Sequence, residues 1–266
     1  MDLGLKGKVV VVTGGSRGIG RDIALAFARE GANLVLCARG KEALDKAVDE
    51  CNSLGVRAIG IVADVGKKDG VDQVINCVIE HFSRIDILIN NAGEAARTHD
   101  AIPEDEIWQE HFNQYVLSVI RMTRKAIEVM LKNGGGRIID ICSSAALEPG
   151  PGSPARSGMK AVLLNISKVW SKRYASQGII FNTVSPGLIK TERLFAPGGT
   201  GEVIAERMGL KDIGEALTAF AKKNMPLGRF VNTEEVGVAV VMLASPVLSG
   251  VVGVNLIVDG GAHASI

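Results

Sequence analysis

The stretch VVVVTGGSRGIGRDIALAFARE, residues 9–30, joins an apolar run, a glycine-rich turn and an amphipathic segment without interruption. The β-branched residues 9–13 predict a buried strand. In residues 19–30 the apolar side chains Ile19, Ile23, Ala26 and Phe27 recur at helical spacing, which predicts a helix with one apolar face. We therefore expect a strand, a tight turn and a helix, which is the first unit of an α/β fold.

The turn between them has the spacing GxxxGxG, with glycines at 14, 18 and 20 rather than the common GxGxxG. Glycines allow the backbone to turn sharply and to approach a pyrophosphate closely. The N-terminus of the following helix offers free N–H groups and the positive end of its dipole. A glycine-rich turn alone is weak evidence, but placed between a strand and an amphipathic helix it indicates a dinucleotide phosphate site.

The rest of the chain repeats the alternation of short apolar runs with helical segments. Most of the runs are apolar throughout, which is typical of parallel strands covered on both faces. We expect a single-domain α/β fold of the Rossmann type, a doubly wound parallel sheet of about seven strands with helices on both faces. The expected strands are 9–13, 33–38, 57–62, 85–90, 137–142, 178–184 and 254–259. The expected helices are 19–30, 41–53, 68–83, 106–132, 155–176, 202–223 and 233–244.

Composition excludes several classes of protein. A chain of 266 residues with 47% hydrophobic and 22% charged residues is typical of a soluble globular domain, and its net charge of +1 indicates no nucleic-acid partner. Four cysteines without a CxxC pair and four histidines without close spacing predict no metal site. The segment MDLGLKGK lacks an apolar targeting region, and no apolar run reaches the roughly 18 residues of a membrane span. We expect a cytoplasmic protein with no membrane partner.

The end of the second expected strand bears on which nicotinamide cofactor is used. An NAD site usually has an acid about 20 residues after the glycine turn, bonded to the ribose 2′-hydroxyl. Here Ala38 takes that place, Arg39 follows, and the first acid is Glu42. Arg17 lies in the glycine turn itself, and two guanidinium groups suit a 2′-phosphate. The alternative is a pair of solvated arginines, but the missing acid favours NADP(H) over NAD.

The irregular stretch ERLFAPGGTGE, residues 192–202, follows the sixth expected strand and precedes a helix. Ligands of doubly wound sheets bind beyond the carboxyl ends of the strands. We expect a substrate loop or lid over about residues 192–214, with a plain surface loop as the alternative.

Together these motifs resemble the short-chain dehydrogenase/reductase family over almost the whole chain, and especially its 3-oxoacyl-carrier-protein reductase-like members. TGGSRGIG, NNAG at 90–93, SPGLIKT at 185–191 and VDGG at 258–261 occur in the family's order and at its separations. The resemblance implies hydride transfer between nicotinamide and a carbonyl or alcohol, and often a homotetramer. With the arginines above, it implies these cofactor-binding residues: Gly14, Ser16, Arg17, Gly18, Ile19, Gly20, Arg39, Asp64, Val65, Asn91, Ala92, Gly93, Lys160, Pro186, Gly187, Ile189 and Thr191.

The family's catalytic residues are Asn, Ser, Tyr and Lys, and the resemblance places three of them on Asn113, Ser143 and Lys160. The tyrosine of its YxxxK motif falls on Arg156, so here the sequence departs from the pattern. The tyrosine gives a proton to the oxygen that becomes negative when hydride arrives at carbon. Arginine can offer charge and hydrogen bonds but hardly releases a proton.

Other residues could replace the missing acid. Tyr115 lies two positions from Asn113 on one expected helix, so the two should face different ways. Tyr174 lies about 27 Å beyond Arg156 along a helix, so neither tyrosine is a good substitute. Three carboxylates lie on loops expected near the site, and each could serve if burial raised its pKa, though each is more often solvated. These are Glu94, Glu148 and Glu192.

Two functional interpretations remain open at this stage. In the first, the protein is an NADP(H)-dependent oxidoreductase that takes its proton from water or a loop carboxylate, while Arg156 stabilises the oxyanion or binds an anionic substrate. In the second, it binds NADP(H) with little or no turnover, as a sensor or as the non-catalytic subunit of a hetero-oligomer. The loops expected to choose the substrate, 94–104, 144–155 and 192–214, contain no readable pattern.

Overall fold

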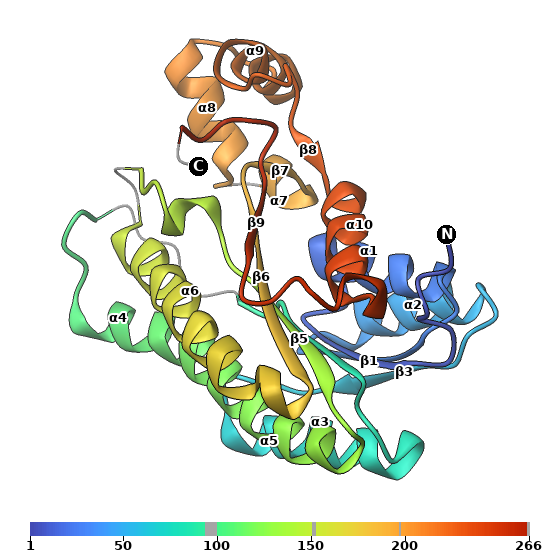
Figure 1. The fold of residues 1–266 in the computed structure, drawn as a ribbon. Coiled ribbons are helices and arrows are strands. Elements are labelled where there is room, and N and C mark those ends of the chain that lie inside the picture. Colours follow the sequence, from blue (N-terminus) through green and yellow to red (C-terminus); the bar gives the residue numbers. More distant parts are fainter. Residues whose placement is uncertain (94–99, 151–152, 197, 265–266) are drawn as a thin grey trace.

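A seven-stranded parallel sheet forms the centre of the molecule (Figure 1). The structure is a computed structural model that describes residues 1–93, 100–150, 153–196 and 198–264. The strands lie in the order β3-β2-β1-β4-β5-β6-β9, and all neighbours pair in parallel. Their bounds are β1 Val9–Thr13, β2 Asn33–Ala38, β3 Ala58–Val62, β4 Ile87–Asn90, β5 Gly136–Ile141, β6 Ile179–Pro186 and β9 Asn255–Val258. This confirms the expected fold class.

Helices cover both faces of the sheet. On one face α1, α2 and α10 pack against the strands, and on the other face α3, α5 and α6 do so. The helices of the two layers are α1 Gly18–Arg29, α2 Lys41–Asn52, α3 Lys68–Phe82, α5 Ser118–Lys132, α6 Pro154–Tyr174 and α10 Thr233–Ala244. Within the described ranges, no helix combines the length and apolarity needed to cross a bilayer.

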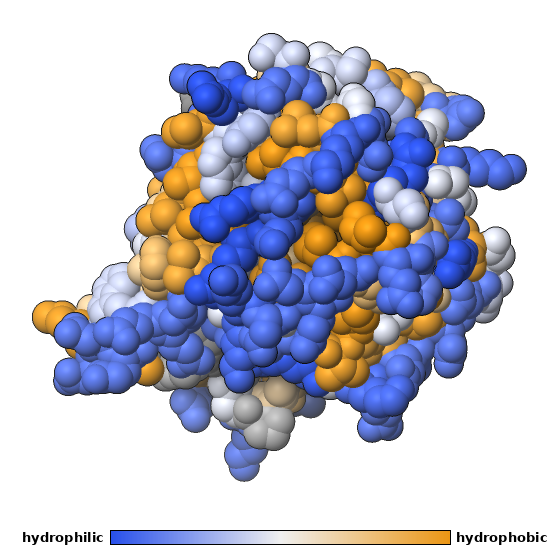
Figure 2. All heavy atoms as spheres, turned by 90° about the horizontal axis from the view of Figure 1, so that it is seen from below, coloured by the Kyte–Doolittle hydropathy of each residue, from blue (hydrophilic) through white to orange (hydrophobic). Residues whose placement is uncertain are grey.

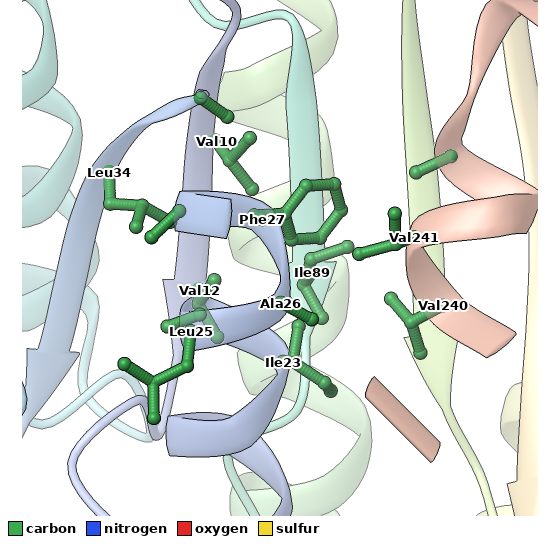
Figure 3. Close-up of a cluster of buried hydrophobic side chains, with 14 of the residues drawn as sticks. Val10, Val12, Ile23, Leu25, Ala26, Phe27, Leu34, Ile89, Val240 and Val241 are labelled. Carbon is green, nitrogen blue, oxygen red and sulfur yellow. The ribbon is translucent and has the colours of Figure 1, made fainter. Parts of the chain in front are cut away.

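The apolar face of α1 is buried as its periodicity predicts. Ile23 and Phe27 are fully buried, and they lie between strand β1 and helix α10, whose Val240 and Val241 complete the cluster (Figure 3). Full burial of a side chain of this size stabilises the fold by about 1.5–3 kcal/mol. The glycine turn before α1 is therefore anchored at both ends by packed elements.

Two of the expected helices are wrong in detail. The segment 106–132 is divided into α4 Asp105–His111, a π-helical turn η1 Phe112–Leu117 and α5. In that turn the N–H of Ser118 donates to the carbonyl of Asn113, five residues back. A π-turn inside a helix often marks a functional site. The residue pattern of 106–132 does not predict this π-helical turn.

The segment 202–223 is also two helices, α8 Thr200–Met208 and α9 Ile213–Asn224. Gly209 ends α8 with a φ of 67°, a conformation that glycine adopts without strain, and Asp212 caps α9 by accepting the N–H of Glu215 at 2.7 Å. A short helix α7 Glu192–Phe195 precedes them. These three helices share a small apolar cluster that lies above the sheet (Figure 1).

The sheet also contains a reversal of strand order. From β1 the chain runs outward through β2 and β3 and then returns to β4 on the other side of β1. In such sheets the crevice at this reversal, beyond the carboxyl ends of the strands, binds the ligand. The ends of β1, β4, β5 and β6 carry the residues that the sequence analysis singled out. Two further short strands, β7 Ile189–Lys190 and β8 Val231–Asn232, pair beside it.

Candidate functional site

The glycine turn after β1 leaves an open surface of backbone. Gly14 and Gly18 have φ values of 66° and 54°, which favour glycine. At Gly20 a Cβ atom would lie 2.2 Å from the carbonyl oxygen of Gly14 and 2.4 Å from the Asn91 amide nitrogen. Any larger residue at Gly20 would therefore force the turn apart, so the three glycines are a geometric requirement of this loop.

Hydrogen bonds join this turn to the loop after β4. The Thr13 hydroxyl donates to the carbonyl of Ile89 at 3.2 Å and accepts the N–H groups of Asn91 and Ala92 at 3.0 Å each. The Asn91 side-chain amide donates to the carbonyls of Thr13 and Gly14 at 3.0 and 3.1 Å. The first and fourth strands thus hold one preformed surface, built by TGGSRGIG and NNAG together.

A pocket of about 230 Å³ lies beyond the ends of β2 and β3, beside this surface. It brings together Arg39 and Asp64, as the sequence analysis expected. It also contains Lys67 and Asp69, which that analysis missed although both lie within five residues of Asp64. Arg17, by contrast, is exposed at the N-cap of α1 and does not line the pocket. Two cations and two carboxylates therefore share its walls.

The segment after β6 closes the opposite side of the crevice. Its Gly187 donates its N–H to Val258 at 3.0 Å, and a Cβ at Gly187 would clash with Asp259 at 2.5 Å. Thr191 lies over the glycine turn, with its methyl group 3.8 Å from the Cβ position of Gly18. Gly187 and Thr191 thus come from one loop that lies between β9 and the glycine turn.

Lys160 is buried between α6 and the end of β5. Its ammonium group donates to the carbonyl of Ile141 at 2.6 Å. Burial lowers the pKa of Lys160 to about 8; the charge of Arg156 acts in the same direction, while Cys142 and Asp140 oppose it. A lysine in this state loses its proton far more readily than an exposed one.

Ser143 follows β5 and caps the short helix η2 Ser144–Ala146. Its hydroxyl oxygen accepts the N–H of Ala145 at 3.3 Å, which leaves the hydroxyl hydrogen available to a second partner. The side chain is buried, close to the carboxyl end of the sheet. The end of β5 therefore places a hydroxyl donor beside the carbonyl that holds Lys160.

Arg156 lies in the first turn of α6, one helical turn before Lys160, and its side chain is exposed. Residues four apart on a helix share a face, so the two cations are close, and the charge of Arg156 lowers the pKa of Lys160. Over the described part of the chain, no carboxylate forms an ion pair with Arg156. Because the first turn of α6 follows the strand that ends near Ser143, we expect the Arg156 side chain to lie within reach of Ser143.

Asn113 and Tyr115 do face different ways, as expected. Asn113 is exposed in the π-turn, whereas Tyr115 is buried with its ring centroid 5.0 Å from the Lys160 ammonium. The Tyr115 ring also lies against Gly93, where a Cβ would clash with it at 2.6 Å. Tyr115 is thus a site residue that the sequence analysis set aside, because spacing on a helix does not reveal what lies opposite.

The remaining alternatives to a tyrosine acid lie at varied positions. Tyr174 packs on Phe181, with ring centroids 6.0 Å apart, at the far end of α6. The Glu148 carboxylate accepts the N–H of Ala264 at 3.1 Å, and Glu192 begins α7 at the surface. Glu94 lies outside the described residues. In the part of the chain that the structure describes, no group of three or more His, Cys, Asp or Glu could hold a metal ion.

Comparison with known proteins agrees with this geometry. The family model for short chain dehydrogenases matches residues 8–196. The 3-oxoacyl-[acyl-carrier-protein] reductase FabG of Thermotoga maritima is 32% identical over 97% of this chain and 98% of its own. The corresponding reductase of Synechocystis is 34% identical over 97% of both chains.

Solved structures show the same architecture. L-sorbose reductase from Gluconobacter frateurii, solved with NADPH and L-sorbose, superposes with a TM-score of 0.93 at 34% identity, over the whole of both chains. Actinorhodin polyketide ketoreductase, solved with NADPH, gives a TM-score of 0.89 at 29% identity over 97% of this chain and 98% of its own.

Proposed function

Because the chain belongs to the short chain dehydrogenase family, we propose that it is an NADP(H)-dependent oxidoreductase that acts on a carbonyl or alcohol. The observation that carries this proposal is the preformed surface of the glycine turn and the Asn91 loop, at the reversal of strand order. A pyrophosphate can approach this surface closely because the turn is rich in glycine, and Gly20 lets the turn pack tightly against Gly14 and Asn91 before the N-terminus of α1. Two similar structures were solved with NADPH, which supports the same cofactor here.

The residues around this surface suit the phosphorylated form of the cofactor. Arg39 and Lys67 offer two cations in the pocket beyond β2, and no acid follows that strand directly, since Ala38 ends it. Asp64 would contact the adenine, with its carboxylate already held by the N–H of Gly66 at 3.0 Å. The proposed cofactor-binding residues are Gly14, Ser16, Arg17, Gly18, Ile19, Gly20, Arg39, Asp64, Val65, Asn91, Ala92, Gly93, Lys160, Pro186, Gly187, Ile189 and Thr191.

NADPH, when bound, supplies hydride to a carbonyl carbon. The chain's own residues then act on the substrate oxygen, where negative charge develops. Ser143 donates its hydroxyl hydrogen to that oxygen, and Arg156 adds positive charge beside it. Lys160 binds the nicotinamide ribose, and Asn113 anchors a water that passes protons to Lys160. The proton that a tyrosine would give comes from water or from a loop carboxylate such as Glu148 or Glu192.

Arg156 also sets an expected substrate class. Arg156 and Lys160 are two cations one helical turn apart, and they repel each other unless an anion lies between them. A substrate with a carboxylate or phosphate would supply that anion and gain a bidentate partner in the guanidinium. The proposed lid spans about residues 192–214 and so includes α7, α8 and the start of α9. These helices lie above the sheet.

One observation favours a second candidate function. The proposed catalytic half of the site has Arg156 at the position of the family's tyrosine, while hydrogen bonds join the glycine turn and the Asn91 loop in the cofactor half. An NADP(H)-binding protein with little turnover, either a sensor or the non-catalytic subunit of a hetero-oligomer, would have this combination.

A homotetramer and a cytoplasmic location belong to the same proposal. The outer face of α6 carries Val169, which is 58% exposed and could meet a second copy. The next residue, Trp170, packs inward on Phe181, with ring centroids 5.7 Å apart, and so does not contribute to that face. The surface seen from below shows separate apolar areas between hydrophilic bands (Figure 2). Light scattering at micromolar concentration tests the assembly, and a monomeric mass would contradict it.

Titration calorimetry and an activity panel together test the main proposal. NADPH should bind at least about tenfold more tightly than NADH, which is about 1.4 kcal/mol. The NADPH complex is then mixed with activated carbonyls in matched pairs, with and without a carboxylate group. Oxidation of NADPH by the acidic members supports the oxidoreductase, whereas tight binding without oxidation of any member supports the binding protein. Equal affinity for NADH would contradict the NADP(H) preference.

A further inference from the structure

Asp140 is a carboxylate in the middle of the protein. It lies near the end of β5, is fully buried, and is covered by β4, α5 and α6. An ionised carboxylate in such a place is costly unless hydrogen bonds or an opposite charge compensate it. Neither the dinucleotide surface nor the proposed chemistry gives this residue a role.

The hydrogen bonds of Asp140 are incomplete. The side-chain amide of Asn90 donates to its Oδ1 at 2.8 Å and to the hydroxyl of Thr123 at 3.1 Å. Ser167 lies close enough to favour the ionised form, yet Oδ2 has no hydrogen-bond partner of ordinary geometry among the described residues. One oxygen of a fully buried carboxyl group is therefore left for a compensating charge rather than a hydrogen bond.

Lys160 and Ser167 lie seven residues apart on one face of α6, and the Lys160 ammonium donates to the carbonyl of Ile141, the residue after Asp140, at 2.6 Å. Burial raises the pKa of Asp140 to about 6, while Asn90, Ser167 and the charge of Lys160 oppose the rise. Asp140 is thus largely ionised at neutral pH, and it stabilises the protonated form of Lys160. Both residues of the pair are buried, whereas Arg156 is exposed.

Cys142 is the other group whose anion could compensate Lys160, and its chemistry excludes it near neutral pH. Burial raises the pKa of its thiol to about 12, so the thiol is uncharged wherever the protein is ordinarily studied. Tyr115 offers only the face of its ring. Of the described groups that act on Lys160, namely Cys142, Arg156, Asp140 and the Tyr115 ring, only Asp140 brings a negative charge at pH 7.

We propose that Asp140 is a positioning residue that keeps Lys160 charged and directed at the end of β5, and so offsets the repulsion that Arg156 introduces. Asp140 is fully buried, Lys160 is 5% exposed and Arg156 is exposed, so the charges alternate in sign with increasing exposure. The charged Lys160 remains fixed by its bond to Ile141, where it can hold ribose hydroxyls and exchange protons with water. The assignment of Lys160 to a cofactor site rests on the proposed function, whereas the coupling of the two charges does not.

Nuclear magnetic resonance of protein labelled with ¹³C at the lysine Cε tests the coupling directly. In Asp140→Asn, which keeps the size of the side chain, the pKa of Lys160 should fall by about one unit or more, a tenfold change in its acid dissociation constant. Cys142→Ala is the matched control, since it removes a neighbour that is neutral, and it should move that pKa by less than about 0.3 units. If the pKa of Lys160 is the same in Asp140→Asn as in the wild type, or shifts equally in Asp140→Asn and Cys142→Ala, the proposal is overturned.

The wild-type protein provides a second measurement that survives if Asp140→Asn does not fold. As Asp140 gains its proton, the Cε resonance of Lys160 should show an inflection with the same midpoint as the ¹³C carboxyl signal of Asp140. If the Lys160 Cε chemical shift has no inflection at the titration midpoint of Asp140, the coupling is contradicted.

Binding of NADPH, followed by fluorescence against pH, separates the two proposals. In Asp140→Asn the loss of affinity at high pH should begin about one unit lower than in the wild type, which a merely structural role would not produce. If the wild type binds no NADPH at any pH while Lys160 still responds to Asp140, the proposed function fails and the charge coupling stands. If NADPH binds normally and the pH profile does not move, the coupling is wrong.

Discussion

The two halves of the crevice differ in how completely they follow their family. Around the ends of β1 and β4, the glycine turn and the Asn91 loop have every expected residue type, and hydrogen bonds between 3.0 and 3.2 Å join them. Around the end of β5 and the start of α6, Ser143 and Lys160 are buried and Arg156 is exposed, and in the proposed site Arg156 takes the place of a tyrosine.

If the proposed function holds, the difference teaches that cofactor binding and chemistry rest on different kinds of structure in this protein. The cofactor half is made of backbone geometry, which tolerates few substitutions because a single Cβ would collide with it. The other half is made of side chains on a helix face, which can change identity while α6 keeps its place. The four substitutions below test this difference between the backbone-built cofactor half and the side-chain-built half.

Arg156→Tyr should give the largest effect on activity, because it supplies a proton donor beside Ser143 and Lys160. General acid catalysis contributes roughly 10²–10⁴ in rate, so reduction of neutral ketones by NADPH should rise by up to that factor in kcat/KM. Arg156→Phe is the control, since it supplies the ring without the hydroxyl and should give no gain. If the wild type already turns over neutral ketones briskly and Arg156→Tyr does not improve it, arginine is itself competent in this site.

Gly20→Ala should weaken cofactor binding by the glycine turn. The new Cβ would lie 2.2 Å from the Gly14 carbonyl, so the turn must open and the phosphates lose their N–H donors. We expect NADPH affinity to fall by roughly 100-fold, about 2.7 kcal/mol, in titration calorimetry. Gly40→Ala serves as the comparison, because a Cβ there meets nothing within 4 Å. Equal affinities for the two variants would mean that the turn is not the phosphate site.

Arg39→Asp should change the preference of the cofactor half without disrupting it. The substitution places a carboxylate in the pocket that also contains Asp64 and Lys67. A carboxylate repels a 2′-phosphate and can bond a 2′-hydroxyl, so the ratio of NADPH to NADH affinity should fall about tenfold. Arg57→Asp, immediately before β3 and outside the pocket lining, is a charge-matched control and should leave the ratio unchanged. A ratio that shifts equally in both variants would show a general charge effect.

The last prediction concerns protein stability and the buried Lys160, and not activity or cofactor affinity. Burial lowers the pKa of Lys160 from 10.5 to about 8, so between those values the unfolded chain binds one proton more than the folded chain. Stability should therefore gain up to about 1.4 kcal/mol per pH unit from Lys160 as pH rises from 8 toward 10. The buried cysteines act in the opposite direction, because burial raises their pKa values.

The difference between wild type and Lys160→Met isolates this contribution, since both proteins contain the same cysteines. Urea unfolding from pH 8 to 10 should show the wild type gaining stability relative to Lys160→Met. Parallel curves would indicate that Lys160 titrates normally in the folded protein.

Local pattern was sufficient for most of the fold. The strands 9–13 and 33–38 were predicted to the residue, because apolar β-branched runs between helical segments have few other structures in an α/β chain. The glycine turn was found from its spacing, since only glycine permits that backbone. The break at Gly209 could also have been predicted, from a glycine followed by the capping Asp212.

The tertiary structure alone decided what surrounds each side chain. The pattern of residues 106–132 is that of one helix, and only the folded chain shows the π-turn that exposes Asn113 and turns Tyr115 toward Lys160. In the sequence, Asp140 is simply a polar residue in an apolar strand. Only the structure shows that β4, α5 and α6 bury it completely. Sequence determines which groups are present and the local backbone they favour. Burial, and with it the pKa of Lys160 and Asp140, arises from segments far apart in the chain that exclude water together.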